Sequence, residues 1–283
     1  MLRPPPPYPY PPPPSGIKTA IAIPSDLVRK TTLREATVKL GYIARAAAIF
    51  RVNAIAIYQM GTVHSLHVAY DILYYHLLPP YLKRYVGKKP HLRYVGTLPP
   101  LKTPSHTGIV IDNKEFRQGI VVKRGRTWVV ADIGKEKPIR AFSRPSPPKK
   151  GQLVWIAIDK SSSRAYVSKP PSEVYTCPSL ETYSTLEDLL SRYSRALCIG
   201  TSRYGTPVHE LFDELVRRLS RLRRLLILFG GPDWGLFDIL PDNLLNKLDY
   251  IVNTFPAQGV ETVRVEEAIL GTLAVLSNLL EGE

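Results

Sequence analysis

The sequence predicts an α/β fold that is interrupted by an all-β barrel, and three observations lead to this prediction. In residues 17–87, strand, helix and strand follow one another without a hairpin turn, and residues 176–283 return to the same alternation. In residues 88–175, helical periodicity gives way to short β-rich runs. Finally, three late strands run into loops that contain glycine, which is typical of ligand sites in open parallel sheets.

The first segment, residues 1–16, is dominated by proline and cannot form a helix. We expect an extended tail of polyproline II character, which is either an unstructured leader or a docking ligand for a partner.

Residues 17–87 read as one α/β unit. Strands are expected at Ala20–Ile23 and Ala54–Tyr58, and helices at Leu33–Val52 and over residues 65–78, because apolar residues recur there at helical spacing. Arg45 stands in the first helix among alanines. The alanines indicate either close approach of another element, such as a partner subunit, or ordinary helix–sheet packing. Arg45 is then a phosphate or dimer contact, or a solvated side chain.

Residues 88–175 predict a small barrel, and an OB-like fold is the first choice, with an SH3-like barrel as the alternative. Trp128 and Trp155 alternate with other apolar residues within strands, so we expect them in the core. The expected strands are Gly108–Ile111, Gly119–Val122, Trp128–Ile133, Ile139–Phe142, Leu153–Ile158 and Ala165–Val167.

Residues 176–283 contain three strands that end in glycine-containing loops. The first, Ala196–Gly200, is preceded by a short helix at Leu186–Tyr193. The second and third strands are Leu225–Phe229 and Tyr250–Val252. Because the carboxyl ends of parallel strands meet at one edge, the three loops should form one site rich in backbone N–H groups.

Two amphipathic helices accompany these strands. One covers residues 207–219, and five arginines lie in its last turn and directly after it, where they either complement the helix dipole or contact nucleic acid. The other should begin at Thr262 as N-cap. Its apolar stripe is formed by Val265, Ile269, Leu273, Leu276 and Leu280.

Charge is distributed unevenly along the chain, whose net charge is +14. Residues 88–175 carry 18 Lys and Arg against 6 Asp and Glu, whereas residues 176–283 carry 10 against 15. A localised positive excess on a barrel favours a nucleic-acid backbone as its partner. The candidate nucleic-acid-binding residues lie in two loop regions of the barrel: Lys123, Arg124, Arg126, Arg140, Arg144, Lys149 and Lys150.

Several other classes of protein are disfavoured. Two cysteines cannot form a disulfide framework, and the six histidines do not cluster at metal-ligand spacing, so no metal site is expected. Gly230–Gly235 contains no lysine, which argues against a nucleotide hydrolase. No apolar run is long enough to span a membrane and no signal peptide is visible, so we expect a cytoplasmic protein.

The three loops also carry a family resemblance. The motifs GTSRYG, LFGGPDWGL and NTFPAQGVETVRVEEAILGTLAVL, together with IAIPSDL and LGYIARAAAIFRVNAIAIY near the N-terminus, resemble the SPOUT class of RNA methyltransferases. The similarity is greatest to the archaeal and eukaryotic branch that carries an inserted OB-like domain and methylates N3 of uridine in RNA. The resemblance implies a C-terminal trefoil knot, a bound S-adenosylmethionine and a homodimer, with RNA such as ribosomal RNA as substrate.

The resemblance also implies roles for particular residues. Glu267 is the candidate for accepting the uridine N3 proton and Arg264 for stabilising the resulting anion, with Arg203 and Arg45 as further candidates. The alternative for each of these side chains is a structural ion pair. Arg203 and Tyr204 stand where the family pattern has an acidic and a basic residue, so the side-chain roles in that loop differ. The alternative function is a non-catalytic RNA-binding protein with a degenerate knot. The candidate cofactor-binding residues are Thr201, Ser202, Gly230, Gly231, Pro232, Gly235, Asn253, Pro256, Gln258, Gly259, Thr262 and Val263.

Overall fold

The computed structural model describes residues 10–12, 16–29 and 31–280, with the side chains of 278–280 excepted. Contacts between residues divide the chain into two compact units. One unit contains residues 78–88 and 102–177, and the other contains residues 14–77, 89–101 and 178–283. Most of the proline-rich tail lies outside the described residues; Tyr10 accepts a hydrogen bond from the Val110 N–H (2.8 Å).

The larger unit is built on a six-stranded sheet in which every pair of neighbouring strands is parallel. The strand order is β12-β10-β11-β1-β2-β9. The α/β fold predicted for both ends of the chain is therefore confirmed. The strands are β1 (Lys18–Pro24), β2 (Ala54–Tyr58), β9 (Ser179–Tyr183), β10 (Leu197–Pro207), β11 (Arg224–Leu228) and β12 (Tyr250–Asn253).

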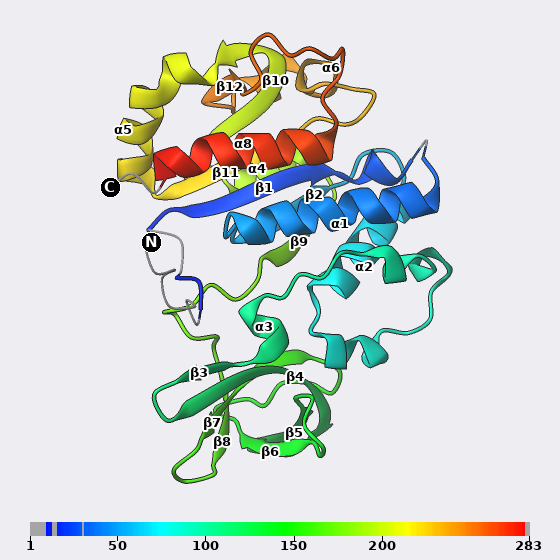
Figure 1. Cartoon of the computed structure of the whole chain (residues 1–283), viewed down its shortest axis with the longest axis vertical. Coiled ribbons are helices and arrows are strands. Elements are labelled where there is room, and N and C mark those ends of the chain that lie inside the picture. Colours follow the sequence, from blue (N-terminus) through cyan, green and yellow to red (C-terminus); the bar gives the residue numbers. More distant parts are fainter. Residues whose placement is uncertain (1–9, 13–15, 30, 281–283) are drawn as a thin grey trace, which may run out of the picture. The chain divides into compact units, whose positions relative to one another are not determined.

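Helices cover both faces of this sheet, as a buried parallel sheet requires. Helix α1 contacts both α2 and α8, and Figure 1 shows α1 and α8 side by side in front of the strands. Helix α1 begins with a capping box between Thr32 and Glu35. The helical segments of this unit are η1 (Ser25–Val28), α1 (Leu33–Ile49), α2 (Val63–Leu77), η3 (Pro90–Leu92), η4 (Val95–Thr97), α4 (Leu186–Arg192), η5 (Val208–Leu211), α5 (Phe212–Leu222), α6 (Leu236–Ile239), α7 (Asp242–Leu245) and α8 (Val265–Leu280).

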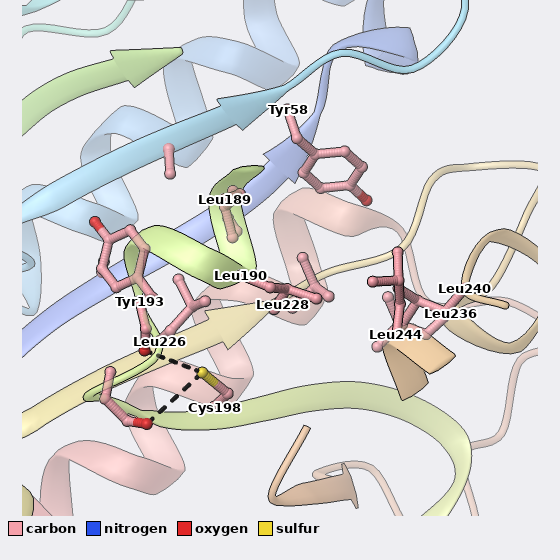
Figure 2. Close-up of a cluster of buried hydrophobic side chains, with 14 of the residues drawn as sticks. Tyr58, Leu189, Leu190, Tyr193, Cys198, Leu226, Leu228, Leu236, Leu240 and Leu244 are labelled. Carbon is pink, nitrogen blue, oxygen red and sulfur yellow. Dashed lines mark hydrogen bonds between the residues drawn. The ribbon is translucent and has the colours of Figure 1, made fainter. Parts of the chain in front are cut away.

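The opposite face of the sheet is covered by α4, α6 and α7. Their leucines pack on alanines of β1 and β2 and on the leucines of β11, and Figure 2 shows this cluster. Cys198 lies among these side chains, and burial raises the pKa of its thiol to about 12. The thiol therefore acts as a small apolar group at neutral pH.

The smaller unit contains a closed β-barrel. Strand β4 pairs with both β5 and β7, and the circuit closes through β6 and β8, so five strands enclose the core while β3 adds to β4. All six strands expected in this segment are present, within a few residues at their ends. They are β3 (Ile109–Ile111), β4 (Lys114–Arg124), β5 (Trp128–Asp132), β6 (Ile139–Phe142), β7 (Leu153–Asp159) and β8 (Ala165–Ser168).

The barrel core is made of small and branched residues, not of tryptophan. Val129, Ala131 and Ala141 are fully buried, whereas Trp128 and Trp155 are only half-buried. The prediction that both tryptophans belong to the core is wrong, because the two-residue alternation of the strands places the smaller neighbours inside. A barrel of five strands has room for only small inward side chains.

Two further helical segments belong to the unit that contains the barrel: η2 (Pro80–Tyr85) and α3 (Pro104–Thr107). The Tyr81 hydroxyl donates to the Gln118 carbonyl at 2.8 Å, and Arg84 forms an ion pair with the buried Asp132. These contacts tie the segment before the barrel to its wall.

Candidate functional site

A cavity of about 290 Å³ lies at the carboxyl edge of the parallel sheet. It is bordered by residues 201–204 within β10, by the segments that follow β11 and β12, and by the first turns of α8. The three loops that the sequence singled out therefore meet at one place. The candidate residues that line the cavity are Thr201, Ser202, Arg203, Gly230, Gly231, Pro232, Gly235, Asn253, Gln258, Thr262 and Val263. Pro256 and Gly259 lie in the β12–α8 loop but outside this lining.

The first wall is a bulge in β10. Both Thr201 and Thr206 pair with Val252 of β12, so residues 202–205 project from the sheet, and the strand resumes to Pro207. The expected loop is thus an interruption within a longer strand. At Gly205 a Cβ would lie 2.6 Å from the Ile251 carbonyl oxygen, so only glycine allows this close approach.

The second wall is the tight loop after β11. The Gly231 N–H donates to the Trp234 carbonyl at 2.9 Å, and the Gly235 N–H donates to an Asp238 carboxylate oxygen at 2.8 Å. A Cβ at Gly231 would lie 3.1 Å from each carboxylate oxygen of Asp26. The loop main chain therefore rests on an acidic side chain that is only 5% exposed.

Asp26 was not predicted as a site residue. It follows β1 in the short helix η1, at the same sheet edge as the cavity loops. Nearby, the buried Tyr58 hydroxyl donates to the Phe229 carbonyl at 2.8 Å. Burial raises the pKa of Tyr58 well above its ordinary value, and the charge of Asp26 adds to this effect. The signal in the sequence was the polar pair Ser25–Asp26 directly after a buried strand.

The third wall is the β12–α8 loop. Asn253 links it to the β10 bulge, because its side-chain N–H donates to the Arg203 carbonyl at 2.9 Å. The side-chain oxygen Oδ1 of Asn253 accepts a hydrogen bond from the Phe255 N–H, also at 2.9 Å. Gln258 donates to the carbonyls of Val260 (2.8 Å) and Glu261 (3.0 Å). The loop is therefore held by its own polar side chains.

Helix α8 begins later than expected. Its first residue is Val265, so Thr262 is not the N-cap and instead lines the cavity. The cap is supplied by Glu267, whose carboxylate accepts a hydrogen bond from the Arg264 N–H at 2.9 Å. A glutamate can reach back to a free N–H at a helix start, and here it does so where threonine was expected.

The four catalytic candidates are not brought together in this chain. Arg203 lines the cavity, and its guanidinium donates to the Glu261 carbonyl at 2.7 Å. Arg264 and Glu267 are exposed at the start of α8, outside the lining. Arg45 lies in α1 and donates to the Pro100 carbonyl, also outside the cavity.

The cavity lining is acidic on balance. Asp233, Asp238 and Glu261 carry negative charge there, against Arg203 as the single basic side chain of the lining. An acidic lining favours a ligand that carries positive charge. Trp234 and Phe237 add exposed aromatic surface to the same rim.

The seven basic residues predicted to bind RNA are all exposed on the barrel. Two of them contact Trp128: the Arg140 guanidinium carbon lies 4.4 Å from the ring centroid, and the Lys123 nitrogen lies 6.0 Å from it. In the other basic cluster, in the last turns of α5 and directly after it, Arg217 pairs with Glu214 and Arg218 with Asp249, so part of that cluster has a structural role.

Neither a metal-ligand cluster nor a membrane-spanning helix is found in the described part of the chain. No group of three or more His, Cys, Asp or Glu residues there could hold a metal ion. No helix within the described ranges is both long and apolar enough to cross a bilayer.

Comparison with known proteins decides the family. A family model described as "Putative RNA methyltransferase" matches residues 18–276, which is nearly the whole chain. The chain belongs to this family. The predicted class, an RNA methyltransferase, is therefore confirmed, and the alternative of a non-catalytic RNA-binding protein is disfavoured.

Relatives match over almost the full length of the chain. An uncharacterized protein from Haloarcula marismortui is 34% identical, over 92% of this chain and 98% of its own. A 28S rRNA (uridine-N(3))-methyltransferase from Drosophila melanogaster is 29% identical, over 93% of this chain and 62% of its own. The protein of the same name from Homo sapiens is 27% identical, over 91% and 77% respectively.

Proposed function

We propose that this chain transfers a methyl group from S-adenosylmethionine to N3 of a uridine in structured RNA, with ribosomal RNA as the substrate class. The observation that carries the proposal is the cavity at which the β10 bulge and the loops after β11 and β12 converge. The names of the eukaryotic relatives supply the acceptor atom and the RNA class.

The residues of the cavity fit this cofactor. Its lining combines main-chain groups of two glycine-containing loops with an acidic balance, and S-adenosylmethionine is a nucleoside that carries a cationic sulfonium. Asp26, buried beneath Gly231, adds negative charge on the same side. Polar contacts of Thr201, Asn253 and Gln258 would orient the adenosine and methionine parts.

Bound S-adenosylmethionine supplies an activated methyl group, so the chain itself must mainly position the uridine and manage its N3 proton. The proton has to leave N3 because the methyl group takes its place. Arg203, which lines the cavity wall, would hold a uridine oxygen and favour the N3 anion. Glu267, exposed at the start of α8, would accept the proton that leaves N3, and Arg264 and Arg45 are further candidates for stabilising the anion.

A homodimer is part of the proposal. Helices α1 and α8 pack against each other, and each exposes large apolar side chains, Tyr42 and Ile49 from α1 and Leu270 from α8. An apolar surface of this kind favours association with a second copy. Arg264 and Glu267 would then lie close to the partner subunit. Light scattering by the purified chain measures the subunit number directly.

The finer fold assignments are also proposed. The sheet order places β10 between β11 and β12. After β10 the chain therefore forms β11 on the inner side of β10, next to β1, and then crosses to form β12 at the sheet edge before α8. This path supports a knotted SPOUT arrangement. In the barrel, the first strand pairs with the second and the fourth, and the third pairs in parallel with the fifth. This Greek-key order supports an OB-like barrel, placed between residues 88 and 175.

The test is transfer of labelled methyl groups to RNA, followed by identification of the methylated nucleoside. We expect the wild-type chain to label RNA at N3-methyluridine. Gly231→Arg should abolish labelling, because any side chain at residue 231 crowds the Asp26 carboxylate and a long one fills the loop. Gly96→Ala is the control, since a Cβ there meets nothing within 4 Å. Equal labelling by wild type and Gly231→Arg would show that the cofactor binds elsewhere.

A further inference from the structure

The outer surface of the barrel carries a row of aromatic side chains that the cavity does not use. Trp128 of β5 pairs with Phe142 of β6, and Phe142 pairs with Tyr166 of β8. Their neighbours Val129 and Ala141 are fully buried. Because successive residues of a strand point to opposite sides, the three rings lie together on the outside of the barrel.

Two members of this row are open to solvent. Phe142 is 48% exposed and Tyr166 is 42% exposed, and their ring centroids are 6.0 Å apart with planes tilted by 38°. Trp128 is different, because Arg140 covers one face of its ring and Gly125 lies so close that a Cβ there would meet the ring at 2.2 Å. Trp128 therefore anchors Arg140, while Phe142 and Tyr166 offer free aromatic surface.

Basic side chains surround the two open rings. A hollow of about 570 Å³ is bordered by Phe142, Tyr166, Arg144 and Arg164, and Arg140 stands two residues before Phe142 on the same face of β6. Within the described chain, none of these three arginines forms a salt bridge with a carboxylate. Their charges are therefore available to a ligand.

This combination matches one kind of ligand. Exposed aromatic rings on a barrel accept the flat faces of unpaired bases, and arginines beside them contact the phosphates between those bases. A duplex has its base faces already stacked, so it would use the arginines but not the rings. An apolar partner protein would not need the three arginines.

We propose that Phe142 and Tyr166 stack on unpaired bases of a single-stranded RNA segment, while Arg140, Arg144 and Arg164 hold its phosphates. The inference rests on the proposed function of the barrel as the RNA-binding part of the enzyme. It adds the form of RNA that the barrel takes, which is a strand with splayed bases next to or within the folded substrate.

The test measures binding of the full-length chain to a labelled oligouridine strand and to an RNA duplex of the same length, over a series of salt concentrations. Phe142→Ala and Tyr166→Ala should each weaken oligouridine binding about 5- to 100-fold, from the usual contribution of one base–aromatic stack. The dependence of binding on salt should stay unchanged, because no charge is lost. Duplex binding should also be unaffected.

Further variants separate stacking from charge. Phe142→Trp should keep oligouridine affinity, whereas Phe142→Leu should lose it, since only an aromatic ring stacks. Arg144→Ala should make the dependence of log affinity on log salt shallower, reducing the magnitude of its negative slope by about 0.7, as expected for one lost phosphate contact with a single strand. Val110→Ala is the matched control, because it truncates an exposed apolar residue on β3, away from the aromatic row.

The outcomes are decisive for the inference and separate from those for the enzyme. Unchanged oligouridine binding by Phe142→Ala, or an equal loss of duplex binding, would overturn the stacking. Absence of oligouridine binding by the wild-type chain would overturn it as well. Methyl transfer abolished by Gly231→Arg with oligouridine binding retained is expected, because the cofactor cavity and the aromatic row use different residues. Methyl transfer that does not respond to Gly231→Arg would contradict the proposed cofactor site and leave the stacking result standing.

Discussion

The contact between Gly205 and β12 allows a sharp test of the cavity geometry. In Gly205→Ala the new Cβ would lie 2.6 Å from the Ile251 carbonyl oxygen and 2.8 Å from the main-chain carbons of Ile251 and Val252. Ordinary contact begins at about 3.4 Å, and main-chain atoms cannot rotate away as a side chain can. The backbone of β12 must therefore shift away from the β10 bulge.

The magnitude follows from two opposing terms. Overpacking of this kind costs about 1–3 kcal/mol. Replacing glycine by alanine lowers the entropy of the unfolded chain, which stabilises the folded state by about 0.4–1 kcal/mol. We expect a net loss of about 1–2 kcal/mol in the free energy of unfolding, together with a roughly tenfold or greater loss of methyl transfer, because Val252 and Asn253 line the cavity.

Chemical denaturation measures the first quantity, and calorimetric titration with S-adenosylmethionine measures the effect on the cavity. Gly96→Ala provides the control, since it makes the same chemical change where a Cβ meets nothing within 4 Å. If Gly205→Ala matched both the wild type and this control in stability and in cofactor affinity, the close approach of β10 and β12 would be refuted.

Two other predictions concern the loop after β12 and two tyrosines, the buried Tyr58 and the half-buried Tyr183. In Gly271→Ala the new Cβ would lie 2.2 Å from the Phe255 ring, so the ring must swing out of the cavity wall. We expect the free energy of unfolding to change little, because the preference of alanine for a helix, about 1 kcal/mol, offsets the cost of moving the ring. The cofactor affinity measured by calorimetry should fall. Unchanged affinity would show that Phe255 does not shape the site. At alkaline pH, burial raises the pKa of Tyr58 and raises that of Tyr183 to about 12, with the Glu181 carboxylate adding to the second shift. Since the unfolded chain releases these protons near pH 10, the stability that they contribute should be complete below pH 10 and should decline above it, as denaturation at stepped pH would reveal. A smaller decline in Tyr58→Phe is expected, and an identical decline would remove Tyr58 from the explanation.

Strands with a continuous apolar pattern could be predicted from the sequence. Ala54–Tyr58 is buried at every residue, so its boundaries were evident. Strand β9 was missed, because Ser179–Tyr183 pairs only with β2 at the sheet edge and keeps a largely polar composition. An edge strand of this kind is specified by its partner, and no pattern in its own residues reveals it.

The candidate site shows the same division. Glycine-containing loops after buried strands were visible in the sequence, and their convergence follows from parallel pairing. The bulge at residues 202–205 was not visible, because it depends on pairing with the distant strand β12. The late start of α8 was not visible, because the cap comes from Glu267 within the helix and not from Thr262. Asp26 was missed because it touches Gly231 only after the ends of the chain have come together. Long-range pairing thus decides which side chains face the cavity.

The position of β1 in the sheet has a consequence for the order of events during synthesis. Lys18 of β1 pairs with Arg224 of β11, so these two strands are neighbours in the sheet although the entire barrel separates them in the chain. On the ribosome, β1 and β2 must therefore wait with one edge uncovered, while the barrel, whose strands pair within one short stretch, has all its partners already made. A growing chain of this design would complete its barrel before the cavity at the carboxyl edge of its parallel sheet could form.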